Sequence, residues 1–276
     1  MTATSETTAT PEQTVIYEKI TIIGVGLIGA STALAARRGK LAGHITACDA
    51  DLVIMAVPVG AMGALAASIV PAMKPGAVLT DSGSTKRSVL RDVDPVISDD
   101  IHWLPSHPLA GTEHSGPAAG HAHLFDGRYW ILVPRDVPDD VVVRFESFLT
   151  GLGSVTERMD ADYHDKVLAL TSHLPHLIAY TIVSTAVDLE TQLKNDVIRF
   201  SASGFRDFTR IAASDPVMWR DVFVNNDEAV LEMLQRFSED LPYLQRAIRW
   251  GEKDKLETLF TRTREIRRSI IDAGQD

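Results

Sequence analysis

Two polar segments of the sequence contain side chains that could move protons. Asp81-Ser-Gly-Ser-Thr-Lys86 and Ser106-His107-Pro-Leu-Ala-Gly-Thr-Glu113-His-Ser-Gly116 each follow a short apolar run that is typical of a strand. An imidazole titrates near neutral pH, so His107 beside a short serine loop could accept a proton from a hydroxyl group. Because ligands of open α/β sheets bind at the carboxyl ends of parallel strands, we expect both segments to lie at such a site.

A third segment is rich in glycine and has the spacing of a phosphate-binding turn. It follows an apolar strand and opens a helix, the context in which a GxGxxG pattern is informative. Gly24 permits the tight turn, Gly26 lets the backbone approach a pyrophosphate, and Gly29 lets helix and strand pack closely. We expect the amide groups at the helix start to bind phosphates. The residues predicted to contact a dinucleotide are Gly24, Val25, Gly26, Leu27, Ile28 and Gly29.

The type of dinucleotide is predicted from one acidic residue. Asp49 lies 20 residues after Gly29, at the end of the next expected strand. A carboxylate there accepts hydrogen bonds from an adenosine ribose and repels a 2′-phosphate. The sequence therefore favours NAD over NADP as the cofactor, with NADP as the alternative.

The elements that would hold these residues change in character along the chain. The first half predicts a helix over 30–38, closed by Gly39, among several strands. These strands are expected at 19–23, 44–49, 52–57 and 77–81, and residues 101–104 and 129–133 would extend the same sheet. Helical spacing dominates the second half, over 163–187, 215–249 and 253–272. This predicts an α/β chain: a Rossmann-type parallel sheet followed by an all-helical domain. We expect a disordered tail over 1–17, a dinucleotide-binding domain over 18–155 and a helical substrate and dimerisation domain over 156–276.

One interval is too short for this fold. Only Ala50 and Asp51 separate Asp49 from Leu52, whereas strands on opposite sides of the first strand need a crossover of a dozen or more residues. The parallel sheet is therefore predicted to be shortened after its second strand. Either a stretch of chain has been left out of the sequence, which we favour, or a deletion has damaged the adenine side of the site.

Composition excludes several other classes of protein. A net charge of −10 argues against a nucleic-acid binder, because attraction to phosphates needs a basic face. The single cysteine, Cys48, excludes an internal disulfide and fits a reducing cytoplasm. The uncharged stretch 52–73 is long enough to span a membrane but is broken by Pro58 and Pro71, so a buried strand followed by a helix is expected instead. No metal site is expected, because the histidines of the 114–123 loop lack suitable partners.

Taken together, the motifs resemble those of the prephenate and arogenate dehydrogenases, pooled as cyclohexadienyl dehydrogenases. The resemblance runs from about residue 19 to 271 and rests on GVGLIGAS, DLVIMAVPV, DSGSTK, SHPLAGTEHSG, TSHLPHLIAY and GFRDFTRIAASDPVMWRD. It implies oxidative decarboxylation of prephenate or arogenate, with hydride transfer to NAD(P), in tyrosine biosynthesis. No residue decides between prephenate and arogenate.

The resemblance also assigns roles to individual residues. His107 looks like the catalytic base for the 4-hydroxyl of the substrate, with Ser84 orienting the imidazole and lying near the nicotinamide. Arg210 looks like the residue that binds a substrate carboxylate. The other residues implied to line the substrate pocket are His176, His173, Thr112, Glu113, Asp207 and Trp219, and those implied to contact the cofactor are Val57, Pro58 and Ser84.

Partners follow from the same resemblance. It implies a homodimer, and inhibition by tyrosine would have to act at the active site. Two other functions stay open. One is an NAD(P)-dependent dehydrogenase of the β-hydroxyacid type, which would have no use for the HPLAGTE loop. The other is a catalytically silent dimeric relative, if the shortened sheet has lost its cofactor site.

Overall fold

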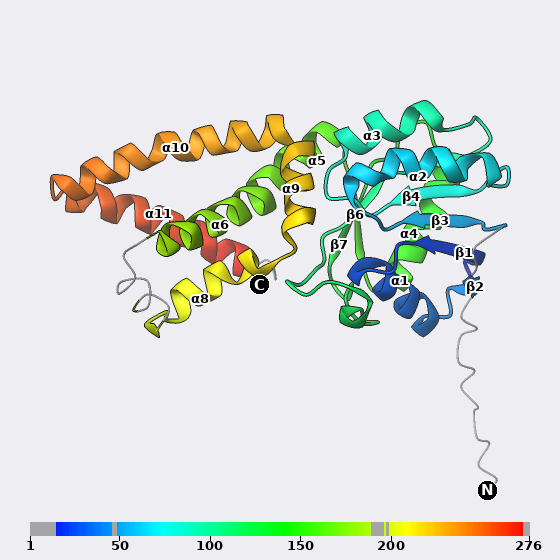
Figure 1. Cartoon of the computed structure of the whole chain (residues 1–276), viewed down its shortest axis with the longest axis horizontal. Helices are drawn as coiled ribbons and strands as arrows, with labels where there is room; N and C mark the ends of the chain where they lie inside the picture. Colours follow the sequence, from blue (N-terminus) through cyan, green and yellow to red (C-terminus); the bar gives the residue numbers. More distant parts are fainter. Residues whose placement is uncertain (1–14, 46–48, 189–195, 197–198, 273–276) are drawn as a thin grey trace, which may run out of the picture. The chain divides into compact units, whose positions relative to one another are not determined.

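The computed structural model describes residues 15–45, 49–188, 196 and 199–272. Their contacts divide the chain into two compact units, Met1–Asp227 and Glu228–Asp276. The first unit holds a parallel sheet with its helices, a smaller second sheet and several helices that follow them (Figure 1). Every residue that the sequence predicts as functional belongs to this unit, so it is the part that positions the site.

The main sheet has five parallel strands in the order β2-β1-β3-β4-β5. The strands are β1 (Tyr17–Ile23), β2 (Ala42–Ile45), β3 (Leu52–Met55), β4 (Val78–Asp81) and β5 (His102–Trp103). The connecting helices are α1 (Leu27–Arg38), α2 (Met62–Ile69) and α3 (Arg87–Val93), with 3₁₀ turns η1 (Val59–Ala61), η2 (Val70–Ala72) and η3 (Asp94–Val96). The parallel sheet, the helix closed by Gly39 and the strand-then-helix form of residues 52–73 confirm those predictions.

Alternate residues of the central strand β3 point to opposite faces, and each face is covered by helices. Leu52 and Ile54 belong to a buried cluster with α1 and α4 (Asp139–Gly151), which includes Phe145 and Phe148. Val53 and Met55 belong to a second cluster, with α2 and α3. The period-two alternation of a strand explains why an uninterrupted apolar run is needed here, since both faces are buried.

The strands β2 and β3 flank β1 but pair with different parts of it. Ile45, the last residue of β2, pairs with Ile20, and Leu52, the first residue of β3, pairs with the same Ile20. The two strands therefore pair with successive halves of β1. Residues 46–48 of the link lie outside the described part of the chain, so the omission or deletion that the sequence predicts here stays a prediction.

Three strands form a separate sheet, and this corrects one prediction. β6 (Ser106–Pro108) pairs antiparallel with β7 (Tyr129–Leu132), and β7 pairs parallel with β8 (Val155–Arg158). The sequence predicted that 129–133 would extend the main sheet, but β7 joins β6 and β8 instead. The 3₁₀ turn η4 (Pro117–Ala119) lies in the long connection between β6 and β7. This second sheet carries His107 on β6.

Helices follow β8, as expected. They are α5 (Ala161–Leu168), a π-helical turn (Ala169–His173), α6 (Leu174–Val187), α8 (Ser203–Thr209), the 3₁₀ turn η6 (Arg210–Ala213) and α9 (Pro216–Asn225). Asp160 caps α5 by accepting a hydrogen bond from the amide of Tyr163, and Asp215 caps α9 in the same way. Among the described residues, Ala161–Ala186 is long and apolar enough to cross a membrane by length and composition alone, and 28% of its most apolar window is buried.

The second unit is formed by α10 (Asp227–Arg249) and α11 (Lys253–Asp272). Gly251, between them, has a φ of +64°, the left-handed conformation that glycine adopts readily after a helix. The helical periods predicted over 215–249 and 253–272 are confirmed, with an interruption at Asn226 that separates α9 from α10.

Candidate active site

The glycine-rich turn between β1 and α1 has the shape of a phosphate-binding site. Gly24 has a φ of +102°, and a Cβ there would lie 2.2 Å from the carbonyl oxygen of Ala56. A Cβ on Gly29 would lie 1.9 Å from the carbonyl oxygen of Gly24. The turn at Gly24 and the close approach of α1 to this turn at Gly29 therefore both require glycine. A Cβ on Gly26 would meet nothing within 4 Å, so this position is open. No side chain caps α1 among the described residues, which leaves its first amide groups for a pyrophosphate.

Two other residues predicted at the cofactor site lie beside this turn. Val57 follows β3 and its Cγ1 would be 3.2 Å from a Cβ on Gly24, so the end of β3 borders the glycine turn. Pro58 is exposed at the next position. In the motif itself, Val25 is exposed, whereas Leu27 and Ile28 pack partly against the core. The glycine motif and the end of β3 thus lie next to each other.

Asp49 is not brought to this turn. Its carboxylate forms an ion pair with Lys19 Nζ at 2.6 Å, and its side chain is 62% exposed. Lys19 lies in the first half of β1, next to Ile20, which pairs with Ile45 of β2. The glycine turn begins only after Ile23, at the end of β1. Of the strand predicted over 44–49, the structure describes β2 as far as Ile45, and residues 46–48 lie outside the described part of the chain.

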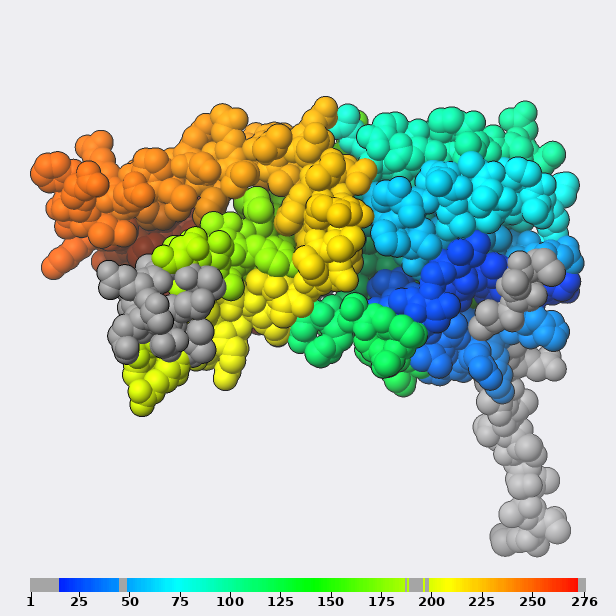
Figure 2. All heavy atoms as spheres, in the orientation of Figure 1, coloured from blue at the N-terminus to red at the C-terminus, as the bar shows by residue number. Residues whose placement is uncertain are grey.

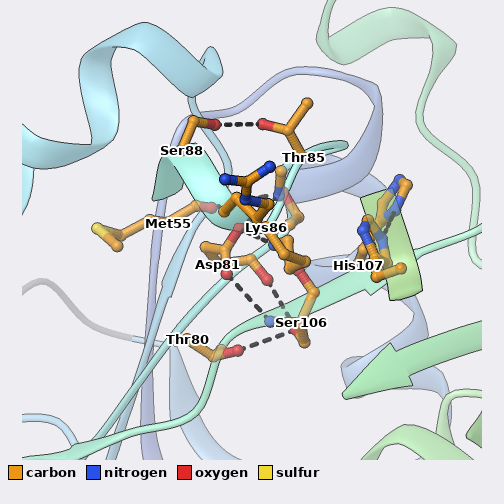
Figure 3. Close-up of polar contacts among 12 residues, drawn as sticks. Met55, Thr80, Asp81, Thr85, Lys86, Ser88, Ser106 and His107 are labelled. Atoms are coloured by element: carbon orange, nitrogen blue, oxygen red, sulfur yellow. Dashed lines mark hydrogen bonds and ion pairs between the residues drawn. The ribbon is translucent and has the colours of Figure 1, made fainter. Parts of the chain in front are cut away.

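A buried ion pair fixes the segment that precedes His107 (Figure 3). Lys86 and Asp81 are fully buried, and Lys86 Nζ donates to Asp81 Oδ2 at 2.5 Å and to the carbonyl oxygen of Ser106 at 2.6 Å. The other carboxylate oxygen of Asp81 accepts the amide of Ser106 at 3.0 Å. Burial lowers the pKa of Lys86, although the neighbouring carboxylate opposes this shift. The pair holds both backbone groups of Ser106, directly before His107.

His107 is part of a buried chain of hydrogen bonds that the sequence analysis did not find. Nδ1 of His107 lies 2.9 Å from Nε2 of His164, and Nδ1 of His164 lies 2.8 Å from Oδ1 of Asp165. The amides of Lys86 and Arg87 also donate to this carboxylate, at 2.7 and 2.9 Å. Burial by itself would raise the pKa of Asp165, but these hydrogen bonds lower it, so Asp165 is an anion that only accepts.

The ionised Asp165 determines which nitrogen of each imidazole carries the proton. Because Asp165 accepts, Nδ1 of His164 must donate and its Nε2 is a lone pair. Nε2 of His164 then accepts from Nδ1 of His107, which leaves Nε2 of His107 unprotonated. Burial, followed by the charges of His164, Lys86 and His173, holds the pKa of His107 well below its usual range. His107 is thus a neutral imidazole with its basic nitrogen free.

The resemblance implies that Ser84 orients this imidazole. Its side chain is half-buried in the loop after β4, and among the described residues it makes no hydrogen bond to His107. The partner of Nδ1 of His107 is His164, and the orienting role that the resemblance implies for Ser84 stays a prediction. The contact from His164 was not predicted, because this α5 residue approaches His107 from 57 residues away, a contact that local spacing does not reveal.

The loop after β6 reaches the predicted carboxylate-binding residue. Arg210 Nη1 donates to Glu113 Oε2 at 2.7 Å, with side chains 56% and 25% exposed. Figure 2 shows the yellow segment of α8 and α9 against the green loop that follows β6. The backbone amide of Glu113 and the guanidinium of Arg210 lower the pKa of Glu113. Thr112, one residue earlier, accepts a hydrogen bond from the amide of His114.

The histidines of α6 and the preceding turn pack on Trp219. The ring of His176 stacks on Trp219 with centroids 3.6 Å apart, and His173 meets the same indole edge-on at 6.0 Å. Asn226 Nδ2 donates to His173 Nδ1, so the proton of His173 is on Nε2. Burial lowers the pKa of His173 to about 4. Nε2 of His173 and Nε1 of Trp219 are buried donors without a partner among the described residues.

Asp207 is not brought into this cluster. It is 69% exposed and pairs with its neighbour Arg206 at 3.3 Å. Asn226, by contrast, was not predicted, although it links the two parts of the site by donating to both His173 and the backbone oxygen of Asp165. Its contacts span 53 and 61 residues and leave no local signal in the sequence.

The dinucleotide turn and the neutral histidine together define a nucleotide-binding dehydrogenase. Two family models match the chain: the nucleotide-binding domain of prephenate dehydrogenase over residues 27–157, and its dimerization domain over residues 160–262. The chain belongs to the prephenate dehydrogenase family.

Individual relatives agree with this assignment. The chain is 37% identical to the cyclohexadienyl dehydrogenase of Zymomonas mobilis, over 92% of this chain and 97% of that protein. It is 31% identical to the prephenate dehydrogenase of Lactococcus lactis, over 92% of this chain and 77% of that protein. Among solved structures, prephenate dehydrogenase from Aquifex aeolicus in complex with hydroxyphenyl propionate and NAD+ has a TM-score of 0.83 at 27% identity, and covers 92% of this chain and 98% of its own.

The alignment with the Zymomonas protein is longer than the part of this chain that it covers. The aligned length is 284 residues, which exceeds the 276 residues of this chain although only 92% of the chain is aligned. The relative therefore contains residues that have no counterpart here.

Proposed function

We propose that the protein catalyses the oxidative decarboxylation of prephenate or arogenate, giving 4-hydroxyphenylpyruvate or tyrosine, with NAD(P) as the hydride acceptor. The observation that carries this proposal is the neutral His107 with an unprotonated Nε2, fixed by His164 and Asp165. A reaction that removes the proton of a ring hydroxyl needs a neutral base of this kind. General-base catalysis accelerates such a step on the order of 10²- to 10⁴-fold.

The chemistry is balanced with few protein groups. As hydride leaves ring carbon 4, His107 Nε2 accepts the proton of the 4-hydroxyl group. The ring carboxylate departs as carbon dioxide and leaves its electron pair in the ring, which becomes aromatic. The proton then returns from His107 to the phenolic oxygen. Bound NAD(P) supplies the hydride acceptor, and the open position at Gly26 and the uncapped start of α1 fit its pyrophosphate.

Arg210 binds a carboxylate of the substrate in this proposal. Its guanidinium uses Nη1 for Glu113, and the remaining donors form a planar fork suited to a second carboxylate. His176, His173 and Trp219 form the wall of the pocket, with the unpartnered nitrogens of the last two available to oxygen atoms of the substrate. Tyrosine, which shares the phenol and the carboxylate of the product, would compete with the substrate at this site.

The protein is further proposed to act as a homodimer in the cytoplasm. The matched helical region is a dimerization domain in its family, and several large apolar side chains are exposed within it. These are Leu170, Ile182, Phe200, Phe208, Val217, Met218 and Val224. Light scattering of the purified protein should give twice the chain mass, and Ile182→Glu on α6 should shift it toward the monomer, with Val143→Glu on α4 as the exposed control. A monomer that binds lipid vesicles would instead mean that this face meets a membrane.

Reduction of NAD or NADP at 340 nm, with prephenate and arogenate in parallel, tests the activity. Turnover with either substrate is expected, and His107→Asn should lower kcat at least 100-fold, whereas His44→Asn on the exposed part of β2 should not. Absence of turnover in a folded protein, together with loss of NADH binding, would favour the catalytically silent relative.

A further inference from the structure

Lys86 contacts the groups that support His107 from two sides. Its backbone amide donates to Asp165 Oδ1 at 2.7 Å, and the same carboxylate oxygen accepts from Nδ1 of His164. Its ammonium group donates to the carbonyl oxygen of Ser106 at 2.6 Å, and Ser106 is the residue directly before His107. Since His164 also contacts Nδ1 of His107, these five residues form a closed contact cycle, in which Lys86 joins the two ends.

The two ends of the contact cycle fix different features of His107. The contact from His164 fixes the rotation of the imidazole and the nitrogen that carries its proton. The contact from Lys86 to Ser106 fixes the backbone from which the side chain of His107 leaves β6. A catalytic group has to be held within about 0.5 Å of its productive position, which requires contacts to the groups behind it. Lys86 supplies such contacts at both ends.

The charge of Lys86 is not explained by stability alone. Lys86 and Asp81 are both fully buried. Taking two charges out of water costs several kcal/mol per ion, and apolar side chains of similar volume often replace such a pair without loss of stability. What the pair adds here is direction, because Asp81 accepts the amide of Ser106 while Lys86 donates to its carbonyl oxygen (Figure 3). Both backbone groups of Ser106 are thus held by side chains of fixed geometry.

The ammonium group also acts on the imidazole. The charged and titratable groups around His107 are His164 and Asp165 on α5, His173 in the π-helical turn, Asp81 at the end of β4 and Lys86 before α3. Burial is the main cause of the low pKa of His107, and positive charge on His164, Lys86 or His173 lowers it further. Because burial also lowers the pKa values of His164 and His173, Lys86 is the cation among these three at neutral pH.

We propose that Lys86 is a positioning residue for His107, whose backbone amide and ammonium group close the contact cycle through Asp165, His164 and Ser106. The ammonium group also disfavours protonation of His107 and so keeps the base available. The proposal rests on the proposed function for its effect on turnover, whereas the state of the imidazole can be measured without any substrate.

The test variant combines Asp81→Asn with Lys86→Met, so that no charge is left buried without a partner. NMR of the full-length protein with ¹³C-labelled histidine follows His107, whose signal is assigned by its loss in His107→Asn. Of the buried pair, the ammonium group is the one that acts on the pKa of His107. Its loss should therefore move the midpoint of the His107 titration up by about 0.5 to 1 pH unit.

Turnover of the same double variant gives the second measurement. With a misplaced base, kcat should fall by roughly 10- to 100-fold while KM changes less than about threefold. The acid limb of the pH profile of kcat/KM should move up together with the titration of His107, because only the neutral imidazole can accept the proton.

Thr80→Val is the matched control for loss of packing. Thr80 is fully buried in the same polar network, and its Oγ1 lies 2.9 Å from Ser106 Oγ. The substitution removes this hydrogen bond without changing any charge. It should lower the free energy of unfolding but leave the His107 titration and kcat as in the wild-type protein.

Either an unchanged His107 titration or an unchanged kcat in the folded double variant would overturn the proposal. Equal losses of kcat in the double variant and in Thr80→Val would overturn it as well, since they would reflect packing alone. If the double variant does not fold, the wild-type protein with ¹⁵N-labelled lysine decides: Lys86 should give a slowly exchanging ammonium signal at neutral pH, and a neutral amine would reject the proposal. If the wild-type protein turns over neither prephenate nor arogenate, the proposed function fails, and a raised His107 midpoint in the double variant would still support the contact cycle.

Discussion

Nδ1 of His107 lies 2.9 Å from Nε2 of His164, and this contact joins the two sequence-distant parts of the active site. Behind it, Asp165 binds the far side of His164 and also accepts the amides of Lys86 and Arg87. As in a Ser-His-Asp triad, a buried carboxylate fixes the orientation and the tautomer of a neighbouring imidazole. Here Asp165 does so for His164, and His164 in turn does so for His107. In the proposed mechanism, His164 and Asp165 are therefore positioning residues for the base.

Replacing His164 with Gln should lower kcat by roughly 10- to 100-fold with a small change in KM, the usual cost of losing a residue that orients a catalytic group. Because a proton on His164 disfavours a second proton on His107 and so lowers the pKa of His107, the acid limb of the pH profile of kcat/KM should also move to higher pH. A purely structural role would lower stability without moving this limb. An unchanged pH profile in a folded His164→Gln variant would show that His164 does not affect the pKa of His107.

The low pKa values of the buried histidines also predict how stability depends on pH. His107, His164 and His173 all have pKa values below that of an unfolded histidine, because burial disfavours their charged forms. Their contribution to stability is complete above about pH 6.5 and is lost as the pH falls, down to about 4 for His173. Each histidine contributes on the order of 1.4 kcal/mol per pH unit within its own range. The free energy of unfolding in urea should fall between pH 6.5 and 4.5, and a flat curve there would contradict the assigned neutral forms.

Local spacing was sufficient for some parts of the site and not for others. The glycine turn and His107 could be predicted because each depends on a few adjacent residues and on the strand before it. His164 and Asn226 could not, because they reach the site from 50 or more residues away. Asp49 shows the limit of counting residues: 20 positions after Gly29 is the usual spacing, but the register of β2 places it beside Lys19, at a level that sequence distance does not encode.

The buried ion pair between Asp81 and Lys86 should be sensitive to the loss of one partner. Lys86→Met leaves a carboxylate uncompensated in a fully buried position and is expected to cost about 3–5 kcal/mol of unfolding free energy in urea. The double variant Asp81→Asn with Lys86→Met should recover part of this loss, because no charge is then left buried. Lys74→Met is the control: its pair with Asp51 has the same distance to within 0.1 Å but is partly exposed, and should cost no more than about 1 kcal/mol. Equal losses in the two single variants would contradict the argument from burial.

Arg210→Ala should act on substrate binding. Loss of a charge-assisted contact to a carboxylate is expected to raise KM by about 10- to 100-fold, equivalent to about 1.5–3 kcal/mol, with a smaller effect on kcat. Arg220→Ala removes an exposed arginine that pairs with its neighbour Asp221, and should leave both constants unchanged. If Arg210→Ala lowers kcat and leaves KM as it was, the assignment of Arg210 to ground-state binding is wrong.

Gly26→Ala tests the phosphate-binding turn without disturbing the fold. The added methyl group meets no protein atom within 4 Å, and the φ of Gly26 is −84°, so the free energy of unfolding should stay within about 0.5 kcal/mol. The same methyl group would occupy the space that a pyrophosphate needs at the start of α1, so the dissociation constant of NADH should rise at least tenfold, about 1.4 kcal/mol. Gly204→Ala, another position where a Cβ meets nothing within 4 Å, is the matched control and should bind NADH normally. Unchanged NADH affinity in Gly26→Ala would mean that the dinucleotide does not approach the backbone at Gly26.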